Sequence, residues 1–465
     1  MYDYDVISIG AGSGGCSSAM RSADLGKKVA IVEYRQKDGV GGTCVNRGCI
    51  PTKALVKSAE TYTAVASAAK FGIQVDGFRA DQKAIHAKKN AAINSLRFGL
   101  TNVLIKPRKI DILNGKARFL DEHTLELTDP KGEVRTVTAE NFVIAVGSEP
   151  AMIPAFHING TTIITSNEAL NLPEIPESMT IIGAGALGLE FAYVFSSFGC
   201  KVTVVEMMPH VVPAMKDEEI TGQVSAYLKK QGVEIRTGNK IEEVTERDGM
   251  TVARLGDGEE VVSAMTLVAI GRKLNTGDLD LKAAGVKTTE RGQIITDTHM
   301  RTSVPHIYAA GDITVGPQLS HKAQRQGVVA AENIAGMDSQ IRYDVIPWAI
   351  FMNPEIAGVG LTQAEAEEQG IETTVGRMPF SANEKAMCMQ STTGMIKIVA
   401  RKADGVVVGG QIFGVDASVL ISEIALAVQK GITIDDVATM IHAHPTLAEI
   451  VMECSKNGLG KAFHK

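Results

Sequence analysis

Two closely spaced cysteines are the residues of this chain best suited to redox chemistry. Cys44 and Cys49 lie in the segment GGTCVNRGCIPTK, residues 41–53, with four residues between them. A structural zinc site would need two further Cys or His ligands at short spacing, and the sequence offers none nearby. The six cysteines are also too few and too scattered for a secreted disulfide framework. The pair therefore predicts thiol–disulfide exchange in a reducing, cytoplasmic compartment.

The residues after the pair favour a thiolate at the second sulfur. A helical run over residues 52–67 follows Cys49 directly, which places this cysteine near a helix N-terminus. The positive end of a helix dipole lowers the pKa of a thiol. Lys53, in the first turn of the helix, adds a positive charge. We therefore expect Cys49 to carry the thiolate.

A second group of reactive residue types lies near the C-terminus. A dithiol must lose a proton before it attacks a disulfide, and histidine is the natural base near neutral pH. His444 and Glu449, five residues apart around Pro445, could form a base whose orientation is fixed by a carboxylate. His442 is the weaker candidate, because it precedes the proline by three residues rather than one. The alternative is two surface histidines before a terminal helix.

A glycine motif at the start of the chain predicts a first dinucleotide site. An apolar strand, residues 4–9, is followed by glycines at positions 10, 12 and 15 and by a helical stretch, residues 16–25. This spacing allows a tight turn, close approach of a pyrophosphate and close helix–strand packing. A second strand ends at Glu33, 18 residues after the last glycine, where a carboxylate would accept hydrogen bonds from a ribose.

The same pattern recurs in the middle of the chain and predicts a second dinucleotide site. The strand 178–182 is followed by glycines at positions 183, 185 and 188, and the next strand ends at Glu206. No arginine follows Glu206 to hold a 2′-phosphate, and its carboxylate would repel one. The second site should therefore prefer NAD over NADP.

The remaining segments predict how the domains are closed and joined. Apolar strands at 142–148 and 267–272 read as closing strands of two nucleotide domains. After residue 343, alternating strands at 392–400 and 406–413 and helices at 417–430 and 447–461 predict an antiparallel sheet with helices on one side. Such a domain offers a surface for a symmetric dimer. The predicted fold class is α/β, with two Rossmann-like dinucleotide-binding domains and a C-terminal α+β dimerisation domain.

Charge and hydropathy exclude several classes of partner. The 465 residues carry a formal net charge of −6 and contain no run of Lys or Arg, which argues against nucleic acid or an anionic membrane. No apolar run reaches the ~18–20 residues that a membrane span needs. The first strand begins almost at Met1, which leaves no room for a targeting segment.

The segment at residues 41–53 resembles the redox-active signature of the flavin disulfide reductases, the class I pyridine nucleotide–disulfide oxidoreductases. The resemblance extends from the first glycine motif to the C-terminal helix. It implies FAD in the first site, NAD in the second, and a homodimer whose active site is shared across the interface. It also implies four regions, an FAD-binding domain at 1–148, an NAD-binding domain at 149–272, a central domain at 273–344 and an interface domain at 345–465.

The resemblance implies a role for each reactive residue. Cys49 is similar to the thiol that faces the flavin, and Cys44 to the interchange thiol that exchanges with substrate. Lys53 would lie near flavin N5 and pair with Glu190 of the NAD-binding domain. The pair formed by His444 and Glu449 is similar to the His–Glu pair that reaches across the dimer to the partner's disulfide.

The resemblance also completes the two cofactor sites. Asp312 resembles the aspartate that binds the ribityl chain, and the N-terminus of a helix at 319–335 would face the flavin pyrimidine. The predicted FAD-binding residues are Gly10, Gly12, Gly15, Glu33, Gly42, Thr43, Ala117, Val146, Gly147, Ser148, Asp312, Leu319, Ser320 and His321. The predicted NAD-binding residues are Gly183, Gly185, Leu187, Gly188, Glu206, Ile241 and Gly271. No metal site is predicted.

Features outside the disulfide segment separate the branches of the family. Glu206 argues against an NADP-dependent glutathione reductase, and the lone Cys454 near the end argues against the C-terminal cysteine pair of a mercuric reductase. The stretch HAHPTLAE, residues 442–449, resembles the dihydrolipoamide dehydrogenase branch. That branch implies a lipoyl-carrying protein of a 2-oxoacid dehydrogenase, glycine-cleavage or similar system as substrate. The alternatives are a glutathione or mercuric reductase-like enzyme, a flavin transhydrogenase or NADH oxidase, and a non-catalytic subunit of a dehydrogenase complex.

Overall fold

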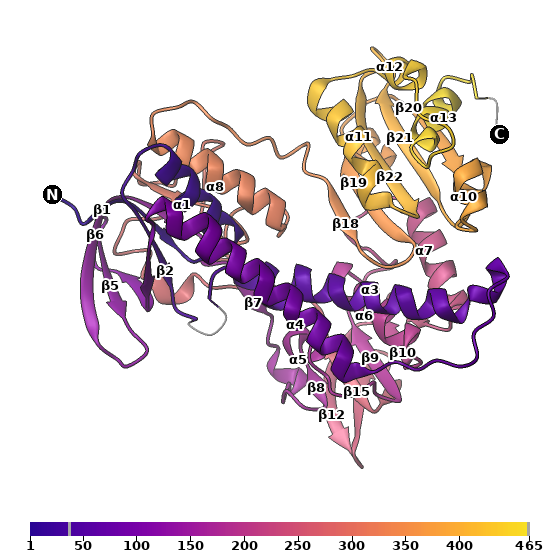
Figure 1. Cartoon of the computed structure of the whole chain (residues 1–465), viewed down its shortest axis with the longest axis horizontal. Helices are drawn as coiled ribbons and strands as arrows, with labels where there is room; N and C mark the ends of the chain where they lie inside the picture. The colour runs from indigo at the N-terminus through magenta and orange to yellow at the C-terminus, as the bar shows by residue number, and fades with distance from the viewer. Residues whose placement is uncertain (36–38, 463–465) are drawn as a thin grey trace. The chain divides into compact units, whose positions relative to one another are not determined.

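The computed structural model describes residues 1–35 and 39–462, and the chain divides into two compact units (Figure 1). The first unit consists of residues 1–54, 84–151 and 271–343. The second consists of residues 55–83, 152–270 and 344–465. The division into four domains at the boundaries given above stays a prediction.

The first unit is built on a parallel sheet. Strand β1 (Tyr4–Ile9) lies between β2 (Val29–Glu33) and β6 (Val134–Ile144), and all three run parallel. Strand β3 (Asp111–Asn114) continues the sheet beside β2, and β17 (Ile307–Ala309) continues it beside β6. All residues of β2 and β17 are buried, as expected for parallel strands that are covered on both faces.

An antiparallel extension and two packed helices complete this unit. The first half of β6 pairs with β5 (Thr124–Thr128), which pairs with β4 (Lys116–Phe119). Helix α1 (Ser13–Asp24) packs along α8 (Ser320–Ile334), as Figure 1 shows. A Cβ atom at Gly327 of α8 would lie 2.2 Å from the carbonyl oxygen of Gly14, so this close contact requires glycine.

The second unit repeats the parallel sheet. Strand β9 (Ser178–Ile182) lies between β10 (Lys201–Val205) and β15 (Met265–Val268). Strands β11 (Glu234–Arg236) and β8 (Ile163–Ile164) form the two edges, and every pairing is parallel. The order β11, β10, β9, β15 therefore matches β3, β2, β1, β6 of the first unit. The edge strands differ, because β8 precedes the other strands of its sheet in the chain and β17 follows them.

The connections of the second unit match those of the first unit as well. Helix α6 (Ala186–Ser197) joins β9 to β10, and helix α7 (Glu218–Lys230) follows β10. Strands β12 (Ile241–Arg247), β13 (Met250–Leu255) and β14 (Glu260–Ser263) form an antiparallel sheet, the counterpart of β4, β5 and the first half of β6. The chain thus contains two nucleotide-binding folds of the same design.

The C-terminal part of the second unit is an antiparallel sheet with helices. The strand order is β18 (Trp348–Ile350), β19 (Glu355–Gly360), β22 (Val407–Gly414), β21 (Met395–Arg401) and β20 (Thr373–Pro379). Buried Phe380 and Ile412 belong to its core. The helices that follow the sheet are α11 (Ala417–Lys430), α12 (Ile434–Thr439) and α13 (Glu449–Gly458).

The other elements are short or connect these sheets. They are α2 (Gly42–Arg47), α3 (Cys49–Ala66), α4 (Gln82–Phe98), α5 (Ser166–Ala169), α9 (Gln363–Glu368), α10 (Glu384–Cys388), β7 (Ser148–Pro150) and β16 (Arg272–Leu274). Among the described residues, no helix combines the length and the apolar character that crossing a bilayer requires.

A buried ion pair joins the C-terminal antiparallel sheet of the second unit to helix α7, which follows β10 of the parallel sheet. Lys397 of β21 places its ammonium group 2.6 Å from Asp217 and 3.0 Å from Glu219. Only 5% of the Lys397 side chain and 2% of the Asp217 side chain are exposed. Asp217 also caps α7 by accepting the N–H of Ile220 at 3.1 Å. The nucleotide fold and the antiparallel sheet therefore depend on a shared buried charge.

We predict that Lys397→Met destabilises the second unit by about 3–5 kcal/mol, because it leaves the buried Asp217 carboxylate without its cation. The measurement is the shift of the thermal midpoint at fixed protein and FAD concentration. Lys402→Met is the matched control, since Lys402 makes an exposed ion pair with Glu372 at 3.3 Å. The control should change stability by less than about 1 kcal/mol. Equal effects of the two changes would contradict the prediction.

Candidate active site

The turn between β1 and α1 leaves backbone open to a bound group. Gly10 has a φ of +107°, and a Cβ atom at Gly15 would lie 1.9 Å from the carbonyl oxygen of Gly10. A Cβ atom at Gly12 would meet only the Cα atom of Gly42, at 4.0 Å. A phosphate can therefore approach the N-terminus of α1, where N–H groups and the helix dipole favour an anion. This turn fits the pyrophosphate of a dinucleotide.

Glu33, at the end of β2, is positioned by the same turn. Its carboxylate accepts the N–H of Ala11 at 3.1 Å and the N–H of Arg35 at 2.9 Å. Burial raises the pKa of the Glu33 carboxyl, and these N–H donors oppose the rise. A buried carboxylate held beside a phosphate-binding turn fits the ribose contact that the sequence predicts.

The turn between β9 and α6 repeats this geometry. Gly183 has a φ of +104°, and a Cβ atom at Gly188 would lie 1.9 Å from the carbonyl oxygen of Gly183. A Cβ atom at Gly185 would face open space. Glu206 accepts the N–H of Ala184 at 2.7 Å and, with its other oxygen, the N–H of Met208 at 2.9 Å. The residues present therefore fit a second dinucleotide.

The other predicted NAD-binding residues, Leu187, Ile241 and Gly271, lie on three separate segments of the chain. Leu187 is half-buried in the first turn of α6. Ile241 begins β12, two residues after Asn239, whose N–H donates to the carbonyl of Glu206 at 3.0 Å. Gly271 has a φ of +131° and belongs to the first unit, so its contact with NAD stays a prediction.

Asp312 belongs to a polar cluster at the carboxyl end of the first parallel sheet. The hydroxyl of Ser148 donates to its carboxylate at 2.5 Å. Arg272 donates to the hydroxyl and the carbonyl of Ser148 at 2.6 and 2.5 Å, and its Nε lies 3.8 Å from Asp312. Arg272 reaches Ser148 through the pairing of β16 with β7, a contact that residue spacing along the chain does not reveal.

A buried lysine supports the turn that carries Asp312. The ammonium group of Lys322 lies 3.3 Å from the carbonyl oxygens of Gly311 and Val315 and 3.4 Å from the hydroxyl of Thr314. Burial lowers the pKa of Lys322 to about 8, and the Asp312 carboxylate opposes this shift. Lys322 therefore fixes the backbone on both sides of the predicted ribityl contact.

The remaining predicted FAD residues lie in the first unit as well. Leu319 directly precedes α8, whose first residue Ser320 lies 2.6 Å from Ser13, hydroxyl to hydroxyl. The N-termini of α8 and α1 therefore meet. The other members of this group are Ala117 on β4, Val146 and Gly147 after β6, Thr43 in α2 and the exposed His321.

Backbone contacts attach the cysteine segment to the first glycine turn. The N–H of Gly41 donates to the carbonyl of Ala11 at 2.8 Å. A Cβ atom at Gly42 would lie 2.6 Å from the Cα atom of Gly12, so the two backbones are in direct contact. Cys44 and Cys49 are half-buried free thiols, and the thiol of Cys49 donates a hydrogen bond to Cys44. The two sulfurs therefore lie beside the first dinucleotide site.

The two sulfurs shift each other's pKa in opposite directions. The hydrogen bond from Cys49 lowers the pKa of Cys44; burial opposes it, but Ser320, Lys53 and Ser13 bring this pKa to about 6. The same hydrogen bond, followed by burial and the Cys44 charge, raises the pKa of Cys49. The expectation that Cys49 carries the thiolate stays a prediction. The donors that converge on Cys44 favour a thiolate there and oppose the effect of the helix dipole at Cys49.

Asn46, between the two cysteines, is held from both sides. Its amide group donates to the carbonyl of Gly42 at 2.9 Å. Its amide oxygen accepts two hydrogen bonds from the guanidinium group of Arg97, on α4, at 3.1 and 2.6 Å. Arg97 thus fixes the segment between the two cysteines. Sequence spacing could not predict this role, because Arg97 and Asn46 are 51 residues apart in the chain.

The structure brings the predicted base and its carboxylate together. Nδ1 of His444 lies 3.0 Å from one oxygen of Glu449, whose other oxygen accepts the N–H of Thr446 at 2.7 Å. Although burial acts the other way, the bonds from Thr446 and His444 hold the pKa of Glu449 below its usual value. The His444 side chain is 66% exposed. Its second nitrogen, Nε2, is therefore accessible to take a proton.

His442, the weaker candidate, has both nitrogens in contact with acceptors. Its Nε2 lies 3.0 Å from the Glu423 carboxylate and its Nδ1 lies 3.2 Å from the carbonyl of Met440. Only 4% of its side chain is exposed. These contacts favour a structural role for His442. Within the described part of the chain, no group of His, Cys, Asp or Glu side chains is arranged to hold a metal ion.

The predicted pairing of Lys53 with Glu190 stays a prediction, because the two residues belong to different units. Glu190 is buried in α6 and accepts the N–H of Phe351 at 3.0 Å. Lys53 lies in the first turns of α3, which begins at Cys49 rather than at residue 52. Pro51 does not delay the helix, because proline is tolerated in the first turn.

We predict that Cys44 reacts with iodoacetamide before Cys49 in the reduced protein, half-maximally near pH 6, because the thiolate is the nucleophile. Peptide mapping identifies each modified cysteine and separates the exposed Cys388. Cys49→Ala should raise the Cys44 midpoint, since it removes the main hydrogen-bond donor. Cys49→Ser, which keeps a donor, should shift it less. Preferential alkylation of Cys49 would contradict the assignment.

Comparisons with known proteins agree with this geometry. A family profile described as "Pyridine nucleotide-disulphide oxidoreductase" matches residues 4–327, and the dimerisation domain of the same family matches residues 346–454. The chain is 39% identical to proteins named dihydrolipoyl dehydrogenase from Geobacillus stearothermophilus and Bacillus subtilis. The alignments cover 99% of this chain and 97% and 98% of those proteins.

Solved structures give the same result. LpdA from Mycobacterium tuberculosis is similar with a TM-score of 0.91 and 27% identity, covering 97% of this chain and 99% of that one. The HOCl-induced flavoprotein disulfide reductase RclA from Escherichia coli, in its Cu(II) complex, is similar with a TM-score of 0.86 and 28% identity. That match covers 98% of this chain and 99% of RclA.

These comparisons confirm the predicted fold class, the oxidoreductase class and the use of FAD and NAD, and they do not favour the alternative activities. The dimerisation domain supports the predicted homodimer. The roles of individual site residues stay predictions. The chain belongs to the pyridine nucleotide-disulphide oxidoreductase family.

Proposed function

We propose that the chain oxidises protein-bound dihydrolipoyl groups to lipoyl groups and reduces NAD⁺, through FAD and the Cys44–Cys49 disulfide. The observation that carries this proposal is the hydrogen-bonded cysteine pair attached to the first dinucleotide turn. The nearly full-length similarity to proteins named dihydrolipoyl dehydrogenase supports the substrate. Glu206, which would repel a 2′-phosphate, supports NAD over NADP.

The first chemical step is thiol–disulfide exchange at Cys44. One substrate thiolate attacks the Cys44 sulfur, a substrate–Cys44 bond forms, and Cys49 leaves as the thiolate. The second substrate thiolate then attacks the substrate sulfur of this mixed disulfide and displaces Cys44. The lipoyl ring closes, and the cysteine pair holds the two electrons as a dithiol. When bound, FAD supplies the chemistry that passes these electrons to NAD⁺.

Cys44 suits the interchange role because its thiolate is stabilised. A sulfur of low pKa is the better leaving group when the second thiolate closes the lipoyl ring. Ser13, Ser320 and Lys53 supply this stabilisation without taking part in bond formation. The two exchange steps release two protons from the substrate; His444 of the partner subunit takes one and a cysteine of the pair takes the other, so the pair holds a single negative charge.

The proton of the attacking thiol goes to His444 of the partner subunit. Glu449 holds Nδ1 of this histidine, which orients the ring and stabilises the imidazolium that forms. A dimer is therefore part of the proposal, because the base and the disulfide come from different copies of the chain.

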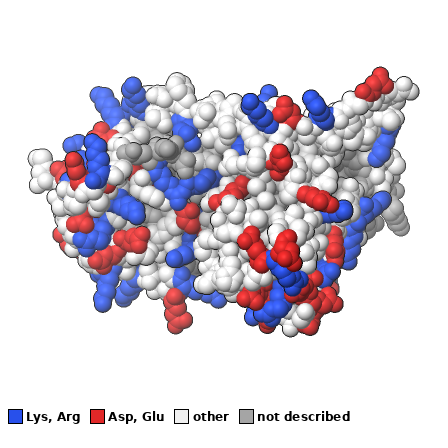
Figure 2. Space-filling view, turned by 90° about the horizontal axis from the view of Figure 1, so that it is seen from below, with Lys and Arg blue, Asp and Glu red and all other residues white. Residues whose placement is uncertain are grey.

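The charge of the surface argues against a polyelectrolyte partner. On the face in Figure 2, basic and acidic side chains are interspersed, and the formal net charge is −6. The similarity to proteins named dihydrolipoyl dehydrogenase supports a lipoyl-carrying protein of a 2-oxoacid dehydrogenase, glycine-cleavage or similar system as the proposed partner, in the cytoplasm.

The test is anaerobic oxidation of dihydrolipoamide with NAD⁺ or NADP⁺, and with glutathione disulfide reduction as the control reaction. We expect turnover with NAD⁺ and little with NADP⁺ or glutathione. Cys49→Ser should abolish this turnover yet retain NADH-to-quinone activity, because the quinone accepts electrons without the disulfide. Brisk reduction of another disulfide, with no lipoyl activity in the wild type, would refute the substrate assignment. Loss of FAD from Cys49→Ser would refute the assigned role of Cys49.

Mixing two inactive variants tests whether the site is shared. We expect Cys49→Ser and His444→Gln each to lose dihydrolipoamide turnover, His444→Gln by about 10²–10⁴-fold. A hybrid dimer then contains one intact site, formed by the disulfide of one chain and the histidine of the other. Random reassociation should restore about a quarter of wild-type activity. Half of the dimers are then hybrids, and each hybrid has one intact active site out of two. No recovery, with hybrids present on native mass spectrometry, would place both groups in one chain.

A further inference from the structure

We infer that Asn383 is a positioning residue for the His444–Glu449 pair, an inference that rests on the proposed function. Asn383 follows β20 and precedes α10, 61 residues before His444 in the sequence. Its effect on the reaction would pass through the turn that carries the base.

A continuous path of hydrogen bonds leads from Asn383 to the base. The amide group of Asn383 donates to the carbonyl of Thr446 at 3.1 Å. The N–H of Thr446 donates to one oxygen of Glu449 at 2.7 Å, and the other oxygen lies 3.0 Å from Nδ1 of His444. The Thr446 hydroxyl closes the turn by donating to the carbonyl of Ala443 at 2.8 Å. Asn383 therefore fixes the backbone of Thr446, and the N–H of Thr446 in turn fixes the Glu449 carboxylate.

Asn383 is itself fixed, so it can act as a rigid support. Its side-chain oxygen accepts the N–H of Ala386 at 2.9 Å and caps α10. Its backbone N–H donates to the carbonyl of Phe380, a fully buried residue of the sheet core, at 3.1 Å. Only 4% of Asn383 is exposed. The amide oxygen of Asn383 is thus bonded to α10, and its amide nitrogen is bonded to the turn at Thr446.

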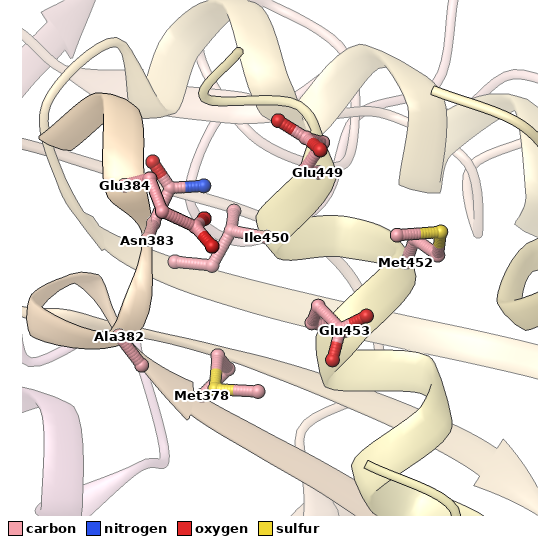
Figure 3. Close-up of a pocket in the computed structure, with 8 residues that line it drawn as sticks. All are labelled: Met378, Ala382, Asn383, Glu384, Glu449, Ile450, Met452 and Glu453. Atoms are coloured by element: carbon pink, nitrogen blue, oxygen red, sulfur yellow. The ribbon is translucent and has the colours of Figure 1, made fainter. Parts of the chain in front are cut away.

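The surroundings of Asn383 argue for support rather than ligand binding. Asn383 and Glu449 line the same small pocket, together with Ile450 (Figure 3). The pocket holds about 60 Å³, far below the ~300–1,000 Å³ of ligand sites. Ile450 is buried and anchors the start of α13 beside Glu449. A few water molecules fit this space, and a cofactor or substrate does not.

Two variants separate the contact to the turn from the helix cap. Asn383→Asp and Asn383→Ser both keep an oxygen that can cap α10, and both lose the amide donor to Thr446. We expect each to lower kcat for dihydrolipoamide by roughly 10-fold or more, because a displaced base is a poorer proton acceptor. NADH-to-quinone activity and FAD content should stay within about twofold of wild type, since neither needs His444. Glu384→Gln, at the neighbouring pocket position, is the matched control and should leave both activities unchanged.

The rate of His444 modification by diethyl pyrocarbonate gives a readout independent of turnover. We expect it to change by about threefold or more in both Asn383 variants, because the imidazole is released from its fixed orientation. Wild-type kcat in both variants, or parallel loss of quinone and dithiol activity, would overturn the inference. If the wild type oxidises no dihydrolipoamide, the proposed function fails. In that case the positioning role is still tested, because an unchanged rate of His444 modification in both Asn383 variants would overturn it.

Discussion

The contact between two stretches of bare backbone is the constraint on which the redox site depends. Gly12 of the first turn and Gly42 of the cysteine segment lie so close that a side chain at Gly42 would collide with its neighbour. The bond from Gly41 to Ala11 fixes the same junction. Because the backbone at Gly12 is also the predicted approach of a dinucleotide, one short segment would serve both the cofactor and the sulfurs. The placement of Cys44 follows from this contact rather than from side-chain packing.

The two nucleotide folds show how a repeated design acquires different uses. In each fold, a glycine turn needs two crowded glycines and one open glycine, and a carboxylate at the end of the next strand holds the turn by its N–H groups. The first fold has a cysteine segment bonded to its turn. The second is joined to the C-terminal antiparallel sheet by the Lys397–Asp217 pair. The repeated part fits a dinucleotide in each fold, and the added contacts are what distinguish the two folds.

Sequence reasoning succeeded where the deciding interactions are local. The glycine spacing, Glu33 and Glu206 could be predicted because a strand, a turn and a helix occupy one short segment. The His444–Glu449 pair also lies within six residues and was found. The acidity of Cys44 could not be predicted, because it depends on donors brought together from three parts of the chain. Arg272, Arg97 and Asn383 were missed for the same reason, since spacing does not reveal which distant loop a polar side chain supports.

The carboxylates of Glu33 and Glu206 are already bonded to the protein's own N–H groups. Their rotamers are therefore fixed when the chain folds, and a dinucleotide does not have to order them. The conformational entropy that a flexible glutamate would lose on binding is lost during folding instead. A protein from which the cofactors have been removed should then keep both dinucleotide sites in the binding conformation. A dinucleotide with a modified ring should bind these sites without reordering the two glutamates.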